Sequence, residues 1–162
     1  MLSVDLEKLA IEPAKSADIN QLTEIMTCAY EDLSSHYLNK KLGPPGYNQV
    51  HAHMDWLIRG KYYKIVYDNL IIGGCILEYY QDLLFIGFLF IDIPYQGKGI
   101  GTYTLKYIES LKASLVEANT PEWAIRNQEF YIKNGYMQID SSYDDILGFR
   151  LFFYQKQIVS KL

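Results

Sequence analysis

Cysteines and clustered basic residues are scarce in this chain of 162 residues. Its two cysteines, Cys28 and Cys75, lie far apart and form no CxxC pair, which excludes a disulfide scaffold and favours a reducing compartment. Lys40-Lys41 is the one adjacent basic pair, and the net charge is −4. Nucleic-acid binding depends on clustered basic residues, so we expect no nucleic-acid partner.

Histidine is also rare, with three residues in the chain. His51 and His53 are two positions apart, whereas a helical zinc pair needs a spacing of four, and no cysteine lies nearby in the sequence. On a helix the two rings would point in different directions. We therefore expect no metal site and interpret both histidines as surface residues.

No apolar run is long enough for a membrane helix, which needs about 20 residues. The longest run, residues 83–91, would instead reach about 30 Å as a strand, which suits a central strand buried on both faces. Asp5 also stands where a secretory signal would need basic residues and then an apolar core. We expect a cytoplasmic protein without a membrane partner.

The overall composition, with 49% hydrophobic and 21% charged residues, is that of an ordinary globular protein. This length suits a single domain over residues 1–162, because domains typically have about 100–200 residues. The 15 tyrosines are unusual, since each phenol needs packing partners or a function.

Hydrophobic periodicity predicts alternating strands and helices in the order β-α-α-β-β-β-α-β-α-β-β. Asp18 and Gln21 resemble a helix cap, Gly60 a helix end, and Gly73-Gly74 an irregular point in a strand. The predicted fold is an α/β sandwich of mixed strand direction. The expected strands are residues 9–12, 61–67, 70–80, 83–93, 115–119, 136–139 and 146–154, and the last two pair around a turn at residues 141–145.

The most informative segment is Gln96-Gly97-Lys98-Gly99-Ile100-Gly101-Thr102. Its alternate glycines let backbone N–H groups approach a ligand closely, and they open onto a helix N-terminus, which attracts anions. A pyrophosphate would fit there, with Lys98 as an additional charge; a glycine-rich turn without a ligand is the alternative. Asp92 excludes a P-loop and Thr102 excludes the dinucleotide fingerprint, since both motifs need glycine at those positions.

Two motifs resemble those of a known family. Gln96-x-x-Gly99-x-Gly101 resembles the Q/R-x-x-G-x-G/A signature of the GCN5-related N-acetyltransferase (GNAT) family. The segment from Phe130 to Tyr136 resembles the F-Y-x-x-x-G-F/Y signature of the same family. The motifs occur in the usual order, and the predicted element order matches from about residue 9 to 154.

This resemblance implies a GNAT-type α/β fold, in which a mixed, mainly antiparallel sheet has flanking helices and splayed central strands. Acetyl-CoA, the cosubstrate, would lie where the strand at 83–93 diverges from the strand at 115–119. The main chain of Leu89, Phe90 and Ile91 would pair with its pantetheine arm. Gln96 would brace the loop, and the pyrophosphate would bind Gly97, Lys98, Gly99, Ile100, Gly101 and Thr102.

The resemblance also assigns catalytic residues. Tyr131 matches a tyrosine that acts as general acid near the thioester sulfur in many members, although it could instead be a packed aromatic. Family chains often have an asparagine where this chain has Ala124; Asn127 could replace it or be a solvated helix residue. Glu117 and Asp92 are candidate general bases, with proton loss to water as the alternative.

We interpret the chain as an acetyl-CoA-dependent N-acetyltransferase that acts on a primary amine, with a small-molecule acceptor favoured. The alternatives are a peptide or protein N-terminal acetyltransferase and a non-catalytic CoA-binding sensor domain. The sequence leaves monomer and homodimer open. The acceptor site is expected between residues 34–60 and the region of Tyr143, with candidates His36, Tyr37, Tyr47, His51 and His53.

Overall fold

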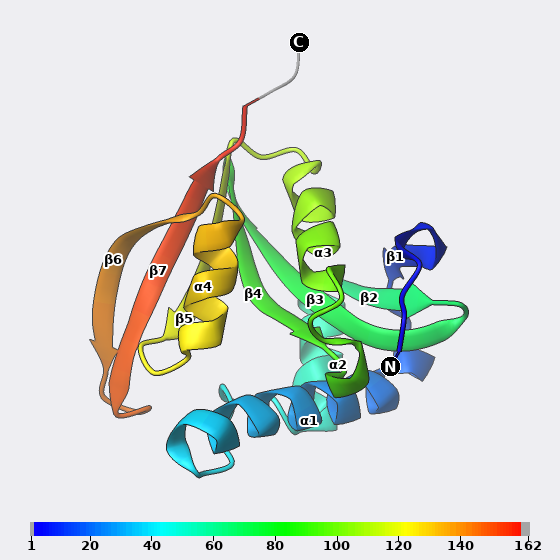
Figure 1. The fold of residues 1–162 in the computed structure, drawn as a ribbon, viewed down its shortest axis with the longest axis horizontal. Helices are drawn as coiled ribbons and strands as arrows, with labels where there is room; N and C mark the ends of the chain where they lie inside the picture. The colour runs from blue at the N-terminus through cyan, green and yellow to red at the C-terminus, as the bar shows by residue number, and fades with distance from the viewer. Residues whose placement is uncertain (1, 160–162) are drawn as a thin grey trace.

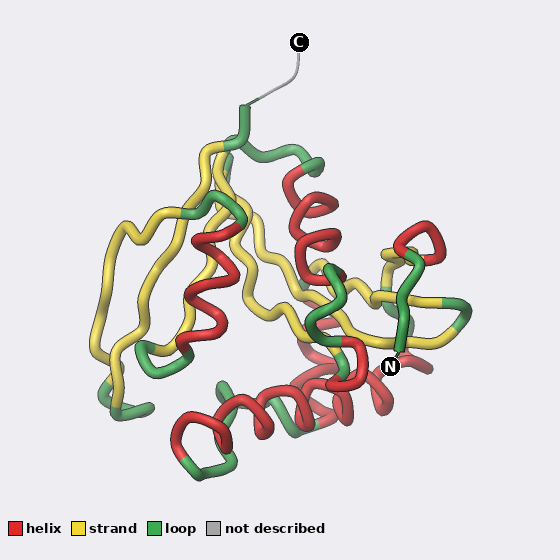
Figure 2. Tube along the Cα trace, viewed as in Figure 1, coloured by secondary structure: helices red, strands yellow, loops and turns green. Residues whose placement is uncertain are grey.

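The computed structural model describes residues 2–159 and contains one seven-stranded sheet (Figures 1 and 2). The strand order is β1-β2-β3-β4-β5-β7-β6, and β4–β5 is the one parallel pair among the described strands. The mixed, mainly antiparallel α/β fold and the predicted element order are therefore confirmed. The strands are β1 Leu9–Pro13, β2 Lys61–Tyr67, β3 Leu70–Tyr80, β4 Leu83–Ile91, β5 Leu115–Pro121, β6 Met137–Asp144 and β7 Phe149–Gln157.

Helices cover both faces of the sheet. In Figure 1, α3 and α4 lie in front of the sheet and α2 lies behind it, while α1 runs across one end. Alternation along β3 explains the two layers, because Cys75 and Leu77 pack with α3 and α4 whereas Ile76 packs with α1 and α2. The helices are α1 Ile19–Leu38, α2 Val50–Arg59, α3 Ile100–Glu109 and α4 Ile125–Lys133.

The centre of the sheet is splayed between β4 and β5. The two strands pair only over Leu83–Ile86 and Leu115–Ala118. Beyond that point β4 continues to Ile91 against β3, while β5 continues to Pro121 against β7. The facing edges of β4 and β5 are therefore left unpaired with each other, and side chains from both helical layers can meet in the gap.

The predicted irregularity in β3 lies next to a close backbone contact. Ile65 pairs with Gly73 and Val66 pairs with Ile71, so the register with β2 shifts there and Ile72 is the extra residue. A Cβ at Gly73 would lie 2.4 Å from the carbonyl oxygen of Phe90. Glycine is therefore needed for β4 to approach β3 at the end that borders the gap.

Several local predictions were wrong. Asp18 occupies the N-cap position of α1, but its side chain does not cap the helix: the carboxylate accepts a hydrogen bond from the Lys15 N–H and pairs with Lys64 at 2.9 Å. Strand β4 ends at Ile91, because Asp92 caps a 3₁₀ turn over Ile93–Tyr95. The late hairpin turns after Asp144, so most of the turn predicted at residues 141–145 is part of β6.

His53 is fully buried, which corrects its assignment to the surface; His51 is exposed. The two ring nitrogens of His53 lie 2.8 Å from the Tyr62 hydroxyl and 2.9 Å from the Tyr47 carbonyl oxygen. Burial lowers the pKa of this imidazole, because charging it would cost solvation. His53 is therefore a satisfied core residue that fixes α2 against β2.

Candidate active site

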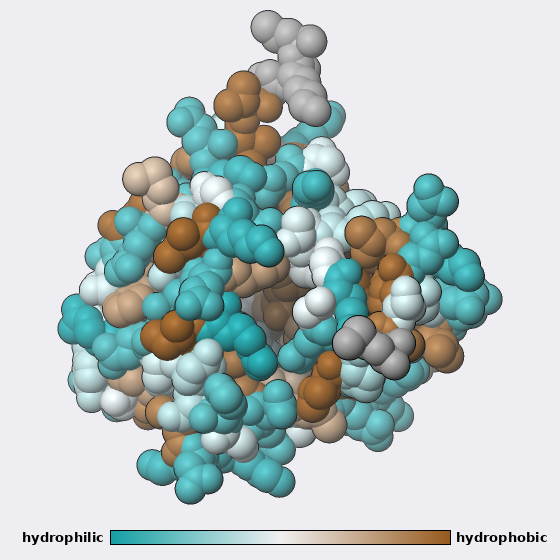
Figure 3. All heavy atoms as spheres, in the orientation of Figure 1, coloured by the Kyte–Doolittle hydropathy of each residue, from teal (hydrophilic) through white to brown (hydrophobic). Residues whose placement is uncertain are grey.

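A cavity of about 530 Å³ opens between α4 and the start of α3. Figure 3 shows this hollow with an apolar floor and a polar rim. We call it the loop cavity, because the glycine-rich loop forms one wall. Its other walls come from α1, α4 and the end of β4. The lining residues are Ala29, Tyr30, Leu33, Leu89–Ile91, Tyr95–Gly97, Gly99–Thr102, Arg126, Asn127, Phe130, Tyr131 and Lys133.

The glycine loop presents backbone rather than side chains to the loop cavity. Gly97 and Gly99 have φ of 71° and 85°, a region that other residues avoid, and Gly99 is the N-cap of α3. A Cβ at Gly101 would lie 2.9 Å from the Phe130 ring, so α3 approaches α4 closely there. The first N–H groups of α3 therefore face this wall and can bind an anion.

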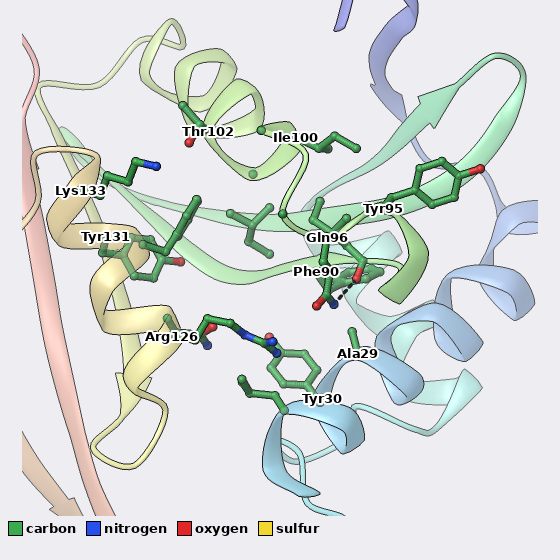
Figure 4. Close-up of a pocket in the computed structure, with 18 residues that line it drawn as sticks. Ala29, Tyr30, Phe90, Tyr95, Gln96, Ile100, Thr102, Arg126, Tyr131 and Lys133 are labelled. Atoms are coloured by element: carbon green, nitrogen blue, oxygen red, sulfur yellow. Dashed lines mark hydrogen bonds between the residues drawn. The ribbon is translucent and has the colours of Figure 1, made fainter. Parts of the chain in front are cut away.

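Gln96 fixes the loop to the sheet. Its Nε2 donates a hydrogen bond of 2.8 Å to the carbonyl oxygen of Ile91, the last residue of β4 (Figure 4). This contact orders the backbone between the strand and α3, as the family motif implied for Gln96. The residues predicted to bind cofactor, apart from Lys98, are thereby brought together along one cavity.

The positive charges of the loop cavity come from α4. Figure 4 shows that Arg126 and Lys133 extend from this helix toward the cavity, and both line it. Lys98, the predicted additional charge, is not among the lining residues. Sequence reasoning missed Arg126 and Lys133, although their spacing of seven residues places them two turns apart on the same face of a helix.

Tyr131 lies in the wall of α4 with its hydroxyl toward the cavity (Figure 4). Its ring stacks on Tyr154, with centroids 5.9 Å apart, and meets Tyr136 edge-to-face. Only 7% of the residue is exposed, and burial raises the pKa of the phenol above its ordinary value. At neutral pH the hydroxyl is therefore protonated and available as a hydrogen-bond or proton donor.

A second cavity of about 450 Å³ adjoins the first. We call it the hairpin cavity, because the β6–β7 hairpin forms its outer wall. Five residues line both cavities, and they mark where the cavities meet: Tyr30, Leu33, Leu89, Asn127 and Tyr131. The remaining lining residues are Leu42, Gly43, Pro44, Pro45, Ile86, Gly87, Phe88, Asn119, Thr120, Pro121, Trp123, Asp144, Ile146, Leu147, Phe149 and Leu151.

Tyr30 is a second phenol at this junction, and the sequence analysis did not identify it. Its ring meets Phe88 and Tyr47 edge-to-face, each with centroids 6.4 Å apart. Burial and the nearby Tyr131 raise the pKa of Tyr30. The available signal was its position four residues after Met26, which places it on the buried face of α1.

Of the other predicted catalytic and binding residues, some line the cavities and some do not. Asn127 lines both cavities, and Ala124 is buried where the family often has asparagine. Glu117 lines neither cavity, and its carboxylate accepts a hydrogen bond of 3.3 Å from Gln155. Asp92 also lines neither cavity, and it accepts a hydrogen bond from the N–H of Ile93. Neither candidate base therefore reaches the junction.

Part of the predicted acceptor region lines the hairpin cavity, but its individually named residues do not. Gly43, Pro44 and Pro45 line the hairpin cavity, as do Asp144 and its neighbours near Tyr143. None of the five named candidates lines either cavity. Tyr37 instead accepts a hydrogen bond from the N–H of Arg126, and Tyr47 donates one to Glu31.

Two polar atoms in the wall of the hairpin cavity are buried without a hydrogen-bond partner among residues 2–159. They are Thr120 Oγ1 and Trp123 Nε1. Thr120 is 1% exposed, and the indole of Trp123 packs edge-to-face on Phe149. This wall is therefore mostly apolar, with isolated polar atoms.

Neither a metal centre nor a membrane helix is found in the described part of the chain. No group of three or more His, Cys, Asp or Glu side chains within residues 2–159 could hold a metal ion. The longest of these helices, α1, has too little apolar character to cross a bilayer.

The splayed sheet and the glycine loop define a GNAT-type acetyltransferase fold, and comparison with known proteins agrees. A sequence model described as "Acetyltransferase (GNAT) domain" matches residues 59–138. Residues 59–138 therefore match the GNAT family, in which acetyl-CoA is the usual cosubstrate. No curated protein matches the sequence.

Solved structures show the same fold at low sequence identity. A GNAT-family acetyltransferase from Streptococcus agalactiae has a TM-score of 0.80 and 18% identity, with 94% of this chain and 96% of that chain covered. The PaiA N-acetyltransferase from Thermoplasma acidophilum, solved in complex with coenzyme A, has a TM-score of 0.75 and 16% identity over 92% and 98%. Ard1 from Thermoplasma volcanium has a TM-score of 0.72 and 12% identity over 94% and 99%.

Proposed function

We propose that this chain is an acetyl-CoA-dependent N-acetyltransferase that moves an acetyl group directly to the primary amine of a small molecule. The observation that carries the proposal is the junction of two unlike cavities at Tyr131. One has a glycine loop and two cations, and the other is apolar with one carboxylate. Two substrates can therefore reach the same phenol, one through each cavity.

The loop cavity fits the cosubstrate. Backbone N–H groups at the start of α3, with Arg126 and Lys133, would hold the pyrophosphate, because all of them favour negative charge. The main chain of Leu89, Phe90 and Ile91 lines the cavity on the side where β4 has left β5. It would pair with the pantetheine arm, since this edge has free backbone groups.

The bound cosubstrate would supply the acyl group and a thiolate leaving group. Tyr131 would hold a proton at its hydroxyl and donate it to that sulfur, because burial keeps the phenol neutral. Asn127, which lines both cavities, carries a carboxamide that can orient either substrate. The amine must lose a proton, and the junction holds neither a carboxylate nor an imidazole within the described residues, so we assign this step to solvent.

The hairpin cavity would hold the acceptor. Residues 42–45 and the β6–β7 turn both line it and limit its extent, which favours a small molecule over an extended peptide. We also propose that the chain is a single domain that works in the cytoplasm as a monomer or homodimer. The free Cys28 and Cys75 fit a reducing compartment.

The test is release of free thiol from acetyl-CoA by the purified chain across a panel of amines, amino acids, polyamines and short peptides. We expect release that depends on the amine, with the acetylated product confirmed by mass spectrometry. A reaction without amine corrects for the exposed Cys28. Tight CoA binding without release for any compound would overturn the enzyme and support a sensor domain.

A further inference from the structure

The lining of the hairpin cavity restricts the charge of what it can bind. Of the side chains that line it in the described part of the chain, Asp144 is the only acid and none is Lys, Arg or His. The cations Arg126 and Lys133 line the loop cavity instead. The two cavities therefore differ in charge, although they share five residues.

Asp144 is itself only partly available. Its Oδ1 accepts hydrogen bonds of 2.9 Å from the N–H groups of Ile146 and Leu147, which hold the hairpin turn. Asp144 lies outside the junction at Tyr131, so it can balance at most one ammonium group besides the amine that reacts there. A ligand carboxylate would be desolvated in an apolar cavity without a cation, which is unfavourable.

The rest of the wall is suited to an apolar body. Aromatic rings of Phe88, Trp123 and Phe149 line the cavity together with leucine and isoleucine side chains. Aromatic faces also attract an ammonium group before it loses its proton. A volume of about 450 Å³ lies in the usual range for small-molecule sites, about 300–1,000 Å³.

We propose that the acceptor is an amine without a carboxylate and with a mostly apolar body of the size of an arylalkylamine. This inference rests on the proposed function, because it assigns the hairpin cavity to the acceptor. It excludes free amino acids, because their carboxylate would be unpaired. It also excludes polyamines and aminoglycosides with more than one additional ammonium group, because Asp144 can pair with only one of them.

The experiment compares kcat/KM for thiol release with three acceptors of matched ring: 2-phenylethylamine, phenylalanine amide and phenylalanine. We expect 2-phenylethylamine and the amide to exceed phenylalanine by at least about tenfold, because only phenylalanine brings an unpaired carboxylate. Spermidine and a phenylalanine-initiated tetrapeptide complete the panel, and both are expected to be poorer than 2-phenylethylamine.

A variant at the cavity rim tests the electrostatic cause directly. Ile146 lines the hairpin cavity and is 92% exposed, so its replacement leaves the core intact. We expect Ile146→Arg to raise kcat/KM for phenylalanine and lower it for 2-phenylethylamine. Ile146→Gln is the matched uncharged control, and Ile139→Arg, on β6 outside both cavities, controls for net charge.

The outcomes separate this inference from the proposed function. No release with any acceptor would overturn the proposed function. Release that prefers phenylalanine, spermidine or the tetrapeptide would leave the N-acetyltransferase intact and overturn the inference about the acceptor. Equal effects of Ile146→Arg and Ile146→Gln on all acceptors would also overturn it.

Discussion

The loop cavity and the hairpin cavity share the wall that contains Tyr131, yet they are built differently. The loop cavity takes its character from backbone, with two left-handed glycines and a helix N-terminus, and adds two cations from α4. The hairpin cavity takes its character from side chains on several elements and has one carboxylate. Under the proposed function, one cavity would recognise a fixed anionic group and the other would bind a particular acceptor.

The largest expected effect follows from removing the phenol at the shared wall. Tyr131→Phe should lower kcat for thiol release by at least about 10²-fold, because a general acid typically contributes that much. The affinity for CoA, measured by calorimetry, should change little. Tyr136→Phe is the matched control, because that hydroxyl donates to Glu109 at 3.0 Å and does not line either cavity. Equal losses in both variants would argue for a packing role of Tyr131.

Substitution of two glycines with similar backbone geometry should affect the two cavities differently. Gly99 and Gly148 have φ of 85° and 81°, so Gly99→Ala and Gly148→Ala should each cost about 1 kcal/mol of folding free energy. Gly99→Ala should also raise KM for acetyl-CoA about tenfold, since it distorts the N-cap of α3. Gly148→Ala should leave that KM unchanged. Steady-state kinetics with thermal unfolding measures both effects, and a parallel rise in KM would contradict the assignment of the loop.

Neutralising one charged side chain in each cavity should raise KM for one substrate and leave KM for the other unchanged. Arg126→Gln should raise KM for acetyl-CoA about fivefold at low salt, and the effect should shrink as salt is added because Arg126 is exposed. Asp144→Asn should raise KM for the amine about as much, while its side-chain oxygen can still accept the turn N–H bonds. Each variant serves as the control for the other. A change in KM for the amine with Arg126→Gln, or in KM for acetyl-CoA with Asp144→Asn, would contradict the assignment of one substrate to each cavity.

A smaller effect should appear in stability. Thr120 Oγ1 is buried in the hairpin cavity wall without a partner in residues 2–159, so Thr120→Val should stabilise the fold by up to about 1 kcal/mol. Thr104→Val is the control, because Thr104 donates a 2.9 Å hydrogen bond to the Ile100 carbonyl and its loss should be destabilising. Urea unfolding with a common m-value measures the difference. Destabilisation by Thr120→Val would show that this hydroxyl is bonded in solution.

The smallest expected effect is the absence of an alkaline decline in kcat. A raised pKa keeps a phenol protonated to higher pH, so the acid form of Tyr131 should persist beyond its ordinary titration near pH 10. At saturating amine, kcat should therefore stay level from pH 8 to about pH 10. Intact fold over this range is checked by circular dichroism. A fall centred below pH 10 would assign the acid to another group.

The fold and the loop cavity could be predicted because their signals are local in sequence. Gly97, Gly99 and Gly101 lie within five residues, and Gln96 reaches back to the strand that precedes them. Strand and helix periodicity is equally local. The turn at 141–145 was misplaced because polar residues on an exposed edge strand resemble a turn.

The hairpin cavity could not be predicted from the sequence, because its lining residues come from segments that are far apart in the chain. Tyr30, Trp123 and Asp144 meet only after α1, the segment before α4 and β6 have packed. Polar spacing alone likewise gave no sign that Glu117 would bond to Gln155 on the neighbouring strand. His53 was misassigned for the same reason, since its partners Tyr47 and Tyr62 lie on other elements.

The short pairing of β4 with β5 has a mechanical consequence. Strands β1–β4 and β5–β7 form two half-sheets whose backbone connection is limited to Leu83–Ile86 and Leu115–Ala118. We call the unpaired remainder of β4 and β5 the seam. A molecule that hydrogen-bonds along the seam would connect the two half-sheets mechanically. Occupancy of the loop cavity would then determine whether the two half-sheets unfold separately or together when the protein is heated or pulled.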